Sequence, residues 1–416
     1  MLDINFIRAN PEKVKEACKN KNVNVDVDLV LSLDKKKREL MTEIEALKAE
    51  QNKISRGGKD NMVLIDQAKE IKAKIKQTEP ELEKIDSELK NLLLQLPNIP
   101  FDDVPVGKDD TQNVVLRKVG QTPKFLFHAP RDYMELGTAL DLIDTERAGK
   151  VAGSRFGYIK RDLALLEFAI IKFGLDTLLK EKFIPVFPPV MLKKEMARGT
   201  GYFEATDEKE AYYLPEDKLY LVGTAEQSLV AMHAGEILNE KDLPLRYTTF
   251  STCFRREAGS YGKDTKGILR VHQFDKLEMV IFSKPEESQK EHELLLSIEE
   301  KLMKALGVPY QVVNICTGDL GRPAAKKYDI EAWLPSEKRY RETHSTSNCT
   351  DFQARRLNIR YRDKSGKVNF VHTLNGTAFA IGRILLMIME NFQQKDGSIK
   401  IPKVLQKYVG KKIIKK

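Results

Sequence analysis

The most regular hydrophobic pattern in the chain lies in its first quarter. Between residues 64 and 96, apolar or small side chains recur at alternating steps of four and three residues, which is the heptad spacing of a coiled-coil helix. These positions are Leu64, Ala68, Ile71, Ile75, Thr78, Leu82, Ile85, Leu89, Leu92 and Leu96. A second, less regular stripe precedes them, with Leu33, Leu40, Leu47 and Ile54 spaced seven residues apart. The pattern predicts two long helices.

A short polar segment containing Gly57 and Gly58 separates the two stripes. Two apolar stripes joined by a short turn can bury each other when the chain folds back, so we expect an antiparallel coiled-coil hairpin over about residues 26–96. At 1.5 Å per residue the second helix is roughly 50 Å long, which is too long for the core of a domain. Pro80 lies inside this helix and predicts a local kink.

Prolines mark the ends of the N-terminal segment. Pro97 and Pro100 follow the second helix, and proline cannot continue a helix. We therefore divide the chain into an N-terminal domain, residues 1–100, and a larger domain, residues 101–416. Near the start of the chain, Pro11 follows Asn10 and predicts the beginning of a short helix.

Beyond residue 110, short β-rich runs alternate with helical ones. Strands are predicted at residues 247–254 and 276–282, and helices at residues 162–181, 286–306 and 377–394. This mixture indicates an α+β fold with a mostly antiparallel sheet and flanking helices.

Composition narrows the class of protein. The chain has 416 residues, of which 41% are hydrophobic and 31% charged, as is typical of a soluble protein with more than one domain. No apolar run is long enough to cross a membrane, and the first residues lack the features of a secretory signal, so we expect no membrane association and a cytoplasmic location. The formal net charge of +9 favours a polyanionic partner. The basic residues 411–416 are expected to form a frayed, solvated end.

The four cysteines, at positions 18, 253, 316 and 349, form no metal-binding or disulfide pattern. Cys349 could be joined by His344 and His372 in a metal site, but a single cysteine without a ligand-spaced pair favours ordinary packing. No zinc is therefore expected.

The richest chemical pattern lies between residues 254 and 278. It indicates a strand, a Gly-rich loop and a returning strand, in which Phe274 and Glu278 share a face. Arginines of this hairpin can hold phosphate or carboxylate groups with two parallel hydrogen bonds. A second run, residues 375–386, is predicted to be an apolar helix with a single arginine, Arg383, which requires an anionic partner.

These two runs resemble motifs 2 and 3 of class II aminoacyl-tRNA synthetases, and residues 183–189 resemble motif 1, the dimer-forming element. Other runs are similar to those of the seryl-tRNA synthetase family in its bacterial form. They are Thr224-Ala225-Glu226, Thr317-Gly318-Asp319-Leu320-Gly321 and Glu342-Thr343-His344-Ser345. With the helical hairpin, the resemblance covers essentially the whole chain. The family often has two small hydroxyl residues where His344 and Ser345 stand and commonly has serine at position 377, but Ser345 and Thr377 keep the hydroxyl groups.

The resemblance implies an enzyme that uses ATP and Mg2+ to form seryl-adenylate from L-serine and then transfers serine to the 3′ end of tRNA(Ser). It implies catalytic roles for Arg255, Arg270 and Arg383, and Mg2+ ligation by Glu342 and Ser345. Serine would be bound by Thr224, Ala225, Glu226, Arg255, Glu278 and Thr377. ATP would be bound by Arg255, Arg256, Glu257, Arg270, Phe274, Glu342, Thr343, His344, Ser345 and Arg383. Within these sets, Phe274 would stack on adenine, Glu257 would contact its amino group, and Glu278 would accept a hydrogen bond from the substrate hydroxyl.

The remaining implied partners are a second copy of the chain and the tRNA, which residues 1–100 would bind through the hairpin. Taken alone, the hairpin would fit an oligomerisation element better than an RNA-binding arm. Two rival interpretations fit parts of the sequence: a related ligase that loads an amino acid onto a carrier protein, and a coiled-coil interaction protein with an inactive nucleotide fold. The hairpin argues against the first, and the presence of both Arg255 and Arg383 argues against the second.

Overall fold

The structure is a computed structural model that describes residues 1–56, 62–125, 129–202, 207–258 and 267–416. The chain divides into two compact units, Met1–Ile99 and Pro100–Lys416. In the described part of the chain, no helix combines the length and the apolar character that crossing a bilayer requires.

The N-terminal unit contains four helices among its described residues. The short helices α1 (Ile4–Ala9) and α2 (Pro11–Asn20) precede two long ones, α3 (Val27–Arg56) and α4 (Met62–Gln95). Pro11 is the first residue of α2, as predicted, because the first turn of a helix needs no hydrogen bond from that position. Where α1 and α2 meet the long helices, a cluster of apolar side chains is buried, made of Ile7, Val14, Val30, Leu33, Ile85, Leu89, Leu93 and Leu96.

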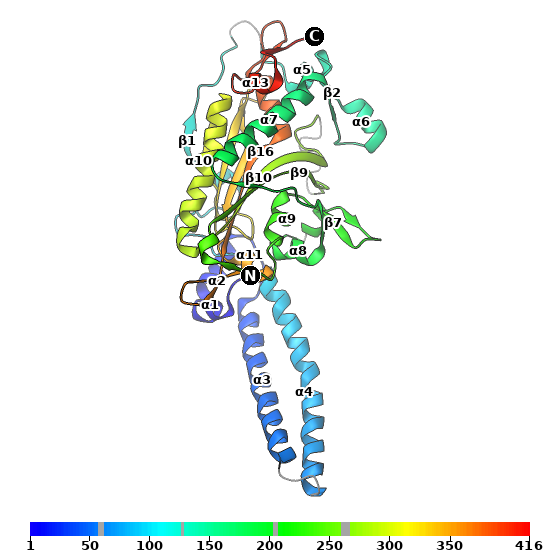
Figure 1. Ribbon diagram of the computed structural model, residues 1–416, viewed down its shortest axis with the longest axis vertical. Coiled ribbons are helices and arrows are strands. Elements are labelled where there is room, and N and C mark those ends of the chain that lie inside the picture. The colour runs from blue at the N-terminus through cyan, green and yellow to red at the C-terminus, as the bar shows by residue number, and fades with distance from the viewer. Residues whose placement is uncertain (57–61, 126–128, 203–206, 259–266) are drawn as a thin grey trace. The chain divides into compact units, whose positions relative to one another are not determined.

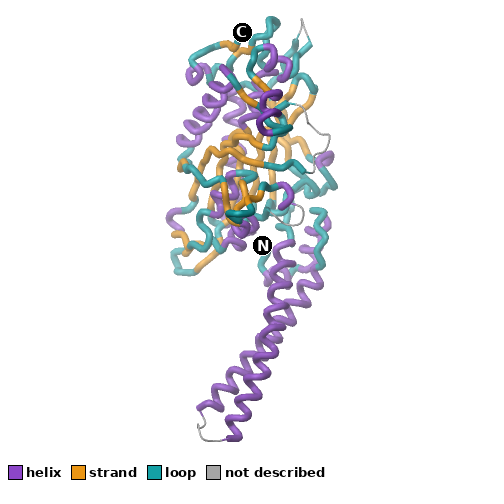
Figure 2. The backbone as a smooth tube through the Cα atoms, turned by 90° about the vertical axis from the view of Figure 1, so that its right-hand side faces the viewer, coloured by secondary structure: helices purple, strands orange, loops and turns teal. Residues whose placement is uncertain are grey.

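Helices α3 and α4 lie side by side and run in opposite directions (Figures 1 and 2). The predicted pair of long helices is thus confirmed. Three ion pairs cross between their described residues and define the register of the pair: Lys36 to Glu81 at 2.6 Å, Lys37 to Asp86 at 2.5 Å and Lys48 to Glu79 at 2.9 Å. Helix α4 continues through Pro80 without a break. The predicted glycine turn at 57–58 lies outside the described residues.

The larger unit is built on an eight-stranded sheet with the order β1-β11-β12-β13-β16-β10-β9-β4. Neighbouring strands are antiparallel except for β4 and β9, which are parallel. The α+β prediction is therefore confirmed, and the two predicted strands correspond to β9 and β10. The strands are β1 (Val114–Val119), β4 (Ile184–Pro185), β9 (Leu245–Phe254), β10 (Gln273–Ser283), β11 (Tyr310–Asn314), β12 (Lys326–Leu334), β13 (Arg339–Asn348) and β16 (His372–Ala380).

Three helices, α7 (Arg161–Lys180), α10 (Ser288–Leu306) and α12 (Ile381–Asn391), cover one face of this sheet (Figure 1). Leu277, Met279 and Ile281 of β10 are fully buried with the apolar sides of these helices in the main core. Because side chains alternate along a strand, the even-numbered residues of β10 point to the opposite face. That face carries the site.

The helix predicted at residues 377–394 is wrong at its start. Residues 377–380 end strand β16, where they pair with β10, and α12 begins only at Ile381. An apolar run does not by itself distinguish a buried strand from a buried helix, so only the pairing with β10 settles where one ends. The other two predicted helices correspond to α7 and to α10 with the short 3-10 turn before it.

A β-bulge brings Thr377 beside Glu278. Leu277 pairs with Phe379, but Glu278 pairs with Thr377, so Ala378 is the extra residue in β16. Ala378 and Phe379 both belong to the helix-covered core. The bulge therefore allows two successive apolar residues to face the core while Thr377 contacts the polar face of β10.

The smaller elements surround this sheet. α5 (Tyr133–Ala139), β2 (Ile143–Asp144), α6 (Thr145–Ala152) and β3 (Tyr158–Ile159) precede α7. Between β4 and β9 lie β5 (Met191–Lys193), α8 (Lys194–Gly199), β6 (Tyr213–Leu214), β7 (Leu219–Leu221), α9 (Ala225–Ala231) and β8 (Ile237–Asn239). Between β13 and β16 lie α11 (Phe352–Leu357), β14 (Arg360–Arg362) and β15 (Val368–Phe370), and after α12 come β17 (Ile399–Lys400), α13 (Gln406–Val409) and β18 (Ile413–Ile414). Side chains of α9 and α11 cover part of the second face of the sheet by packing on Val280 and Phe282.

The C-terminal tail is not frayed, contrary to the sequence-based expectation. Strand β18 pairs with β17, and Ile414 is buried in the main core. Lys411 forms an ion pair with Asp162 at 2.6 Å. The buried side chain of Ile414 fixes this tail in place, although the tail is otherwise rich in lysine.

Candidate active site

Two adjoining cavities lie on the second face of the sheet, with volumes of about 500 and 620 Å³. The smaller is called here the arginine cavity, because Arg255, Arg270 and Arg383 line it. The larger is called the carboxylate cavity, because Glu226 and Glu278 line it. Seven residues line both, namely Arg255, Glu257, Arg270, Lys276, Glu342, Ser345 and Thr377. The two cavities therefore form one continuous site.

Arg255 directly follows strand β9 and stands where the cavities meet. Its Nε donates to the main-chain oxygen of Gly223 at 3.1 Å, and its guanidinium carbon lies 5.3 Å from the centre of the Phe274 ring. Arg270 lies 3.2 Å from the Glu257 carboxylate. Between these residues, positions 259–266 of the predicted Gly-rich loop lie outside the described residues. The two arginines and the half-buried ring of Phe274, which lines the arginine cavity, can together hold a flat ring and its attached phosphates.

Arg383, in the first turn of α12, faces Glu342 of β13 across the arginine cavity. Its Nη1 donates to the main-chain oxygen of Glu342 at 2.8 Å and to its Oε2 at 3.3 Å. The surrounding protein acts to raise the pKa of Glu342, but the cations Arg383, Lys327 and Arg255 outweigh this and lower the pKa to about 2. Glu342 is therefore a carboxylate at neutral pH, and nearly half of its side-chain surface is exposed.

Thr343 and His344 form part of the wall of the arginine cavity. Both are buried, and the Thr343 hydroxyl shares a hydrogen bond of 2.8 Å with Nδ1 of His344. Burial lowers the pKa of His344 to about 3, so its ring is neutral at physiological pH. These two residues shape the wall rather than supply charge, whereas Ser345 lines both cavities.

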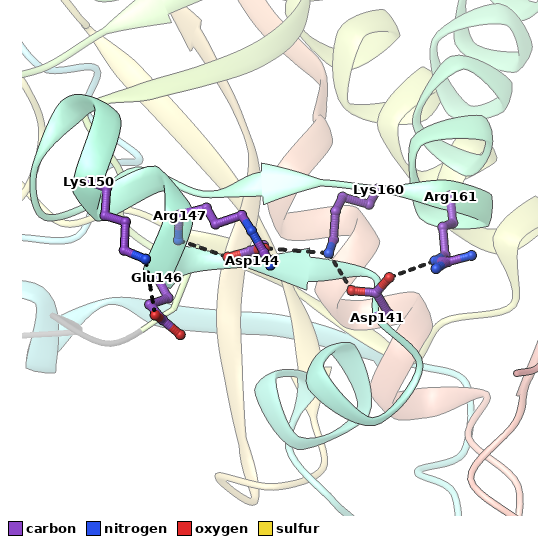
Figure 3. Close-up of polar contacts among 7 residues, drawn as sticks. All are labelled: Asp141, Asp144, Glu146, Arg147, Lys150, Lys160 and Arg161. Atoms are coloured by element: carbon purple, nitrogen blue, oxygen red, sulfur yellow. Dashed lines mark hydrogen bonds and ion pairs between the residues drawn. The ribbon is translucent and has the colours of Figure 1, made fainter.

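Helix α6 and strand β3 close another side of the arginine cavity with residues such as Ala148 and Tyr158. A chain of ion pairs fastens this segment (Figure 3). Lys160 contacts both Asp141 and Asp144, and Arg161 hydrogen-bonds Asp141 at 2.8 Å. Single exposed ion pairs stabilise little, but Lys160 links two carboxylates and so joins the loop after α5 to the start of α6.

Glu278 is the most enclosed carboxylate of the site, with only 1% of its surface exposed. Its Oε1 accepts a hydrogen bond from the Thr377 hydroxyl at 2.8 Å and lies 2.6 Å from the Lys276 ammonium. From the described residues its Oε2 receives a single long contact of 3.4 Å, from the Thr224 hydroxyl. Burying a carboxylate costs free energy unless it is paired and hydrogen-bonded. The ion pair with Lys276 and the hydrogen bond from Thr377 offset that free energy at Oε1.

Glu226, in the first turn of α9, is also buried in the carboxylate cavity. Gln353 donates to its Oε1 at 2.8 Å and Tyr202 donates to its Oε2 at 3.1 Å. Gln353 is itself held by Thr373, which donates to its side-chain oxygen at 2.6 Å. Burial, reinforced by the nearby Glu278, raises the pKa of Glu226 to about 7. A substrate cation beside this group would favour its ionised form and lower its pKa.

Most residues that the sequence singled out meet at these cavities, but Arg256 and Ala225 do not line them. The Arg256 guanidinium lies 6.0 Å from the Tyr212 ring, because successive side chains of an extended segment point in opposite directions. Ala225 is fully buried at the start of α9. Thr224 reaches the site through its contact with Glu278.

The residues of the site that the sequence did not reveal include Lys276, Tyr202 and Gln353. Lys276 lies between Phe274 and Glu278 on one strand face, so the period-two rule could have found it. Tyr202 and Gln353 come from distant parts of the chain, and no local pattern marks either one.

Comparisons with known proteins show the family to which the chain belongs. Residues 211–392 match the core domain of class II tRNA synthetases for glycine, histidine, proline, serine and threonine, and residues 1–100 match the seryl-tRNA synthetase N-terminal domain. A serine–tRNA ligase from Dictyoglomus turgidum is 46% identical, with 99% of this chain and 98% of the relative covered. A crystal structure of seryl-tRNA synthetase from Pyrococcus horikoshii complexed with ATP has a TM-score of 0.94 and 43% identity, covering 100% of this chain and 99% of its own. A cytoplasmic serine–tRNA ligase from Naegleria fowleri in complex with AMP has a TM-score of 0.90 and 34% identity, with 100% and 99% covered. The chain belongs to the seryl-tRNA synthetase family.

Proposed function

We propose that this protein activates L-serine with ATP and then esterifies serine onto the 3′ end of tRNA(Ser). The observation that carries the proposal is that Arg255 and Arg383 line one cavity, which opens directly onto a buried pocket containing two carboxylates. Guanidinium groups suit a triphosphate, and the carboxylates suit a small molecule with an ammonium and a hydroxyl group. Full-length relatives named serine–tRNA ligase support the same conclusion.

In the first step, a serine carboxylate oxygen attacks the α-phosphorus of ATP, and the bond to the β-phosphate oxygen breaks to release pyrophosphate. This reaction requires alignment and shielding of negative charge rather than a catalytic base. We assign Arg255 to the serine carboxylate and the α-phosphate, and Arg270 and Arg383 to the outer phosphates. Phe274 stacks on adenine, and Glu257 contacts the adenine amino group. In the second step, a hydroxyl of the terminal tRNA ribose attacks the seryl carbonyl and AMP leaves.

Mg2+ fits the donors that line the arginine cavity. Mg2+ prefers hard oxygen ligands and is commonly held by one or two protein groups together with the phosphates of the substrate. Glu342 supplies an ionised carboxylate and Ser345 a hydroxyl, and both line the cavity. When bound there, the ion would offset charge on the phosphates.

Serine recognition depends on the two carboxylates in different ways. We assign the substrate ammonium to Glu226 and the substrate hydroxyl to Glu278, helped by Thr377 and Thr224. A pocket built to accept a hydrogen bond from a hydroxyl can reject the analogue that lacks it by about 10⁴ to 10⁵ in kcat/KM. Alanine should therefore be a very poor substrate.

The helical hairpin of the N-terminal unit is proposed to bind tRNA, because a pair of long helices can follow the shape of a folded RNA, and the chain as a whole carries a net charge of +9. The protein is proposed to act as a homodimer. Large apolar side chains are exposed on two neighbouring elements and just after them: Leu165 and Phe168 on α7, Ile184 on β4, and Phe187. Such a group of exposed apolar side chains usually marks an interface. The substrates ATP, serine and tRNA occur in the cytoplasm, which we propose as its location.

Serine-dependent exchange of pyrophosphate into ATP tests the first step directly. We expect exchange with serine, almost none with alanine, and charging of serine tRNA by the same preparation. A chain that exchanges pyrophosphate with serine but charges only a carrier protein would contradict the proposed second step. An absence of exchange with serine would contradict the whole proposal.

A further inference from the structure

The two carboxylates of the site have different electrostatic partners. The partners of the Glu278 carboxylate include an ammonium group, Lys276 Nζ at 2.6 Å, whereas both hydrogen-bond donors of Glu226 in the described part of the chain, Gln353 and Tyr202, are neutral. Both carboxylates are at most 4% exposed, so neither is well screened by water. Charge differences at this depth act strongly on any bound ligand.

Lys276 is placed where it can affect the whole site. It lies on the polar face of β10, two residues from Phe274 and two from Glu278, and it lines both cavities. Only 11% of its side chain is exposed. A lysine ammonium is strongly hydrated, so its burial at this position requires a compensating anion.

Lys276 also makes the two oxygens of the Glu278 carboxylate unequal, because it occupies one of them. Its ammonium and the Thr377 hydroxyl both occupy Oε1, at 2.6 and 2.8 Å. Among the described residues, the Thr224 hydroxyl at 3.4 Å is the one contact of Oε2. A carboxylate oxygen can accept about two hydrogen bonds, so Oε2 keeps capacity for one more donor.

We propose that Lys276 is a positioning residue that sets the orientation of serine in the pocket. It causes Glu278 to bind the neutral hydroxyl of serine and Glu226 to bind the ammonium group. By neutralising Glu278 through Oε1, it leaves Oε2 as an acceptor with little net attraction for a cation. The substrate ammonium is then directed to Glu226, whose two hydrogen-bond donors among the described residues are neutral. This inference rests on the proposed function, because it assumes that serine occupies the carboxylate cavity.

The charge balance explains why a lysine is needed. Two buried carboxylates, one ammonium of Lys276 and one ammonium of serine sum to zero, while Arg255 remains for the substrate carboxylate. Without Lys276, Glu278 would lose the ammonium group that lies 2.6 Å from its Oε1, and an amino acid could place its own ammonium against either carboxylate. Binding in the reversed orientation would be unproductive, since the substrate carboxylate would point away from Arg255.

A double-mutant cycle tests whether Lys276 acts through Glu278. The variants are K276M, E278Q and the double variant, with KM for serine, KM for ATP, kcat and the serine-to-alanine ratio of kcat/KM measured by pyrophosphate exchange. We expect K276M to raise KM for serine at least tenfold and to reduce the serine-to-alanine ratio, while KM for ATP changes less than twofold. The double variant should be no more than about threefold worse than the worse single variant, because both changes remove the same interaction.

Two further variants complete the design. K276R should recover part of the loss in KM for serine, because it keeps the charge. K326M is the matched control: Lys326 also forms an ion pair on this sheet, with Asp103, its side chain is likewise 11% exposed, and it lines neither cavity. K326M should leave the kinetic constants unchanged. If K276M does not fold, K276Q replaces it with the same expectations.

The proposal is overturned if the effects of K276M and E278Q multiply, or if K276M acts on KM for ATP or on kcat alone, because Lys276 would then serve the nucleotide directly. It is also overturned if K326M impairs serine binding as much as K276M does. These results would leave the proposed function intact as long as the unaltered protein exchanges pyrophosphate with serine. Absence of that exchange in the unaltered protein is the separate result that contradicts the proposed function.

Discussion

Arg383 and Glu342 come from different elements, yet the Arg383 guanidinium lies 2.8 Å from the Glu342 main-chain oxygen and 3.3 Å from its carboxylate. This contact joins the start of α12 to strand β13 across the arginine cavity. It holds the only arginine of α12 at the mouth of that cavity, where an outer phosphate can replace the carboxylate as its partner. Arg383 should therefore be critical for activation and dispensable for folding.

Replacing Arg383 by alanine should lower kcat/KM for pyrophosphate exchange by roughly 10²-fold to 10³-fold, the range found when one preorganised donor to a developing charge is removed. Arg383→Lys should recover only part, because an ammonium lacks the two-pronged geometry of a guanidinium. Arg341→Ala, on the same strand as Glu342 but outside both cavities, serves as the control. Unchanged exchange in R383A would refute the role assigned to this arginine.

The hydroxyl of Thr377 should matter more than its methyl group. Thr377→Ser keeps the hydrogen bond to Glu278 and should leave KM for serine within about threefold of the unaltered value. Thr377→Val has the same shape but removes a hydrogen bond to a charged group, which contributes about 1.5–3 kcal/mol, so KM for serine should rise roughly tenfold or more. Equal KM values for the two variants would show that the hydroxyl does not support serine binding.

Shortening the hairpin should separate the two half-reactions. Deleting residues 49–78 and joining the ends through a short Gly-Ser linker removes the distal part of α3 and α4 but keeps the Lys48–Glu79 and Lys37–Asp86 pairs and the apolar cluster near α1 and α2. Pyrophosphate exchange should persist, while kcat/KM for tRNA should fall at least 100-fold if the distal part carries the RNA contacts. A shortened protein that charges tRNA normally would instead favour an interaction role for the hairpin.

The exposed apolar residues near motif 1 should control assembly. Phe168 is 70% exposed on α7, and Phe168→Glu should shift the sedimentation equilibrium toward monomer, because it would bury a charge in the proposed interface. Val106→Glu, at a position 72% exposed elsewhere in the same unit, should leave the mass unchanged. A dimer that resists F168E would move the interface away from α7.

Acid should destabilise the larger unit partly through His292. This residue is buried on α10 and bonds the main-chain oxygen of Thr346 through Nε2 at 3.0 Å; burial lowers its pKa to about 4. The unfolded chain binds a proton near pH 6.5, so the folded state binds fewer protons between pH 6.5 and 4, and stability falls as the pH is lowered through that window. This one group contributes a slope of about 1.4 kcal/mol per pH unit at most.

His292→Gln should reduce that slope, as measured by denaturant unfolding at pH 7.0, 6.0 and 5.0. Burial also lowers the pKa of His344, to about 3, so His344 makes stability fall with pH in the same direction. The slope in the His292→Gln variant should therefore be smaller than in the unaltered protein but not zero. Identical slopes in the variant and the unaltered protein would show that His292 is not the group responsible.

The chain's local patterns were sufficient to predict its elements wherever the pattern was long. The heptads predicted α3 and α4, Pro11 predicted the start of α2, and the β-rich runs predicted β9 and β10. They failed at residues 377–380, where strand pairing continues the sheet, and at the tail, where Ile414 is buried in a core formed by distant segments. Most residues of the site could be predicted from the sequence because they belong to contiguous motifs that resemble those of the family.

The sequence by itself determined the period of each helix and strand, the chemical types at the site and the family to which they point. Only the tertiary structure decided which of those groups meet. In the folded protein, Arg256 points away from the cavities, and a bulge at Ala378 brings Thr377 beside Glu278. Lys276 lines both cavities. The physical reason is that period and composition are properties of neighbours along the chain, whereas charge pairing and burial depend on side chains that approach only when the sheet is assembled.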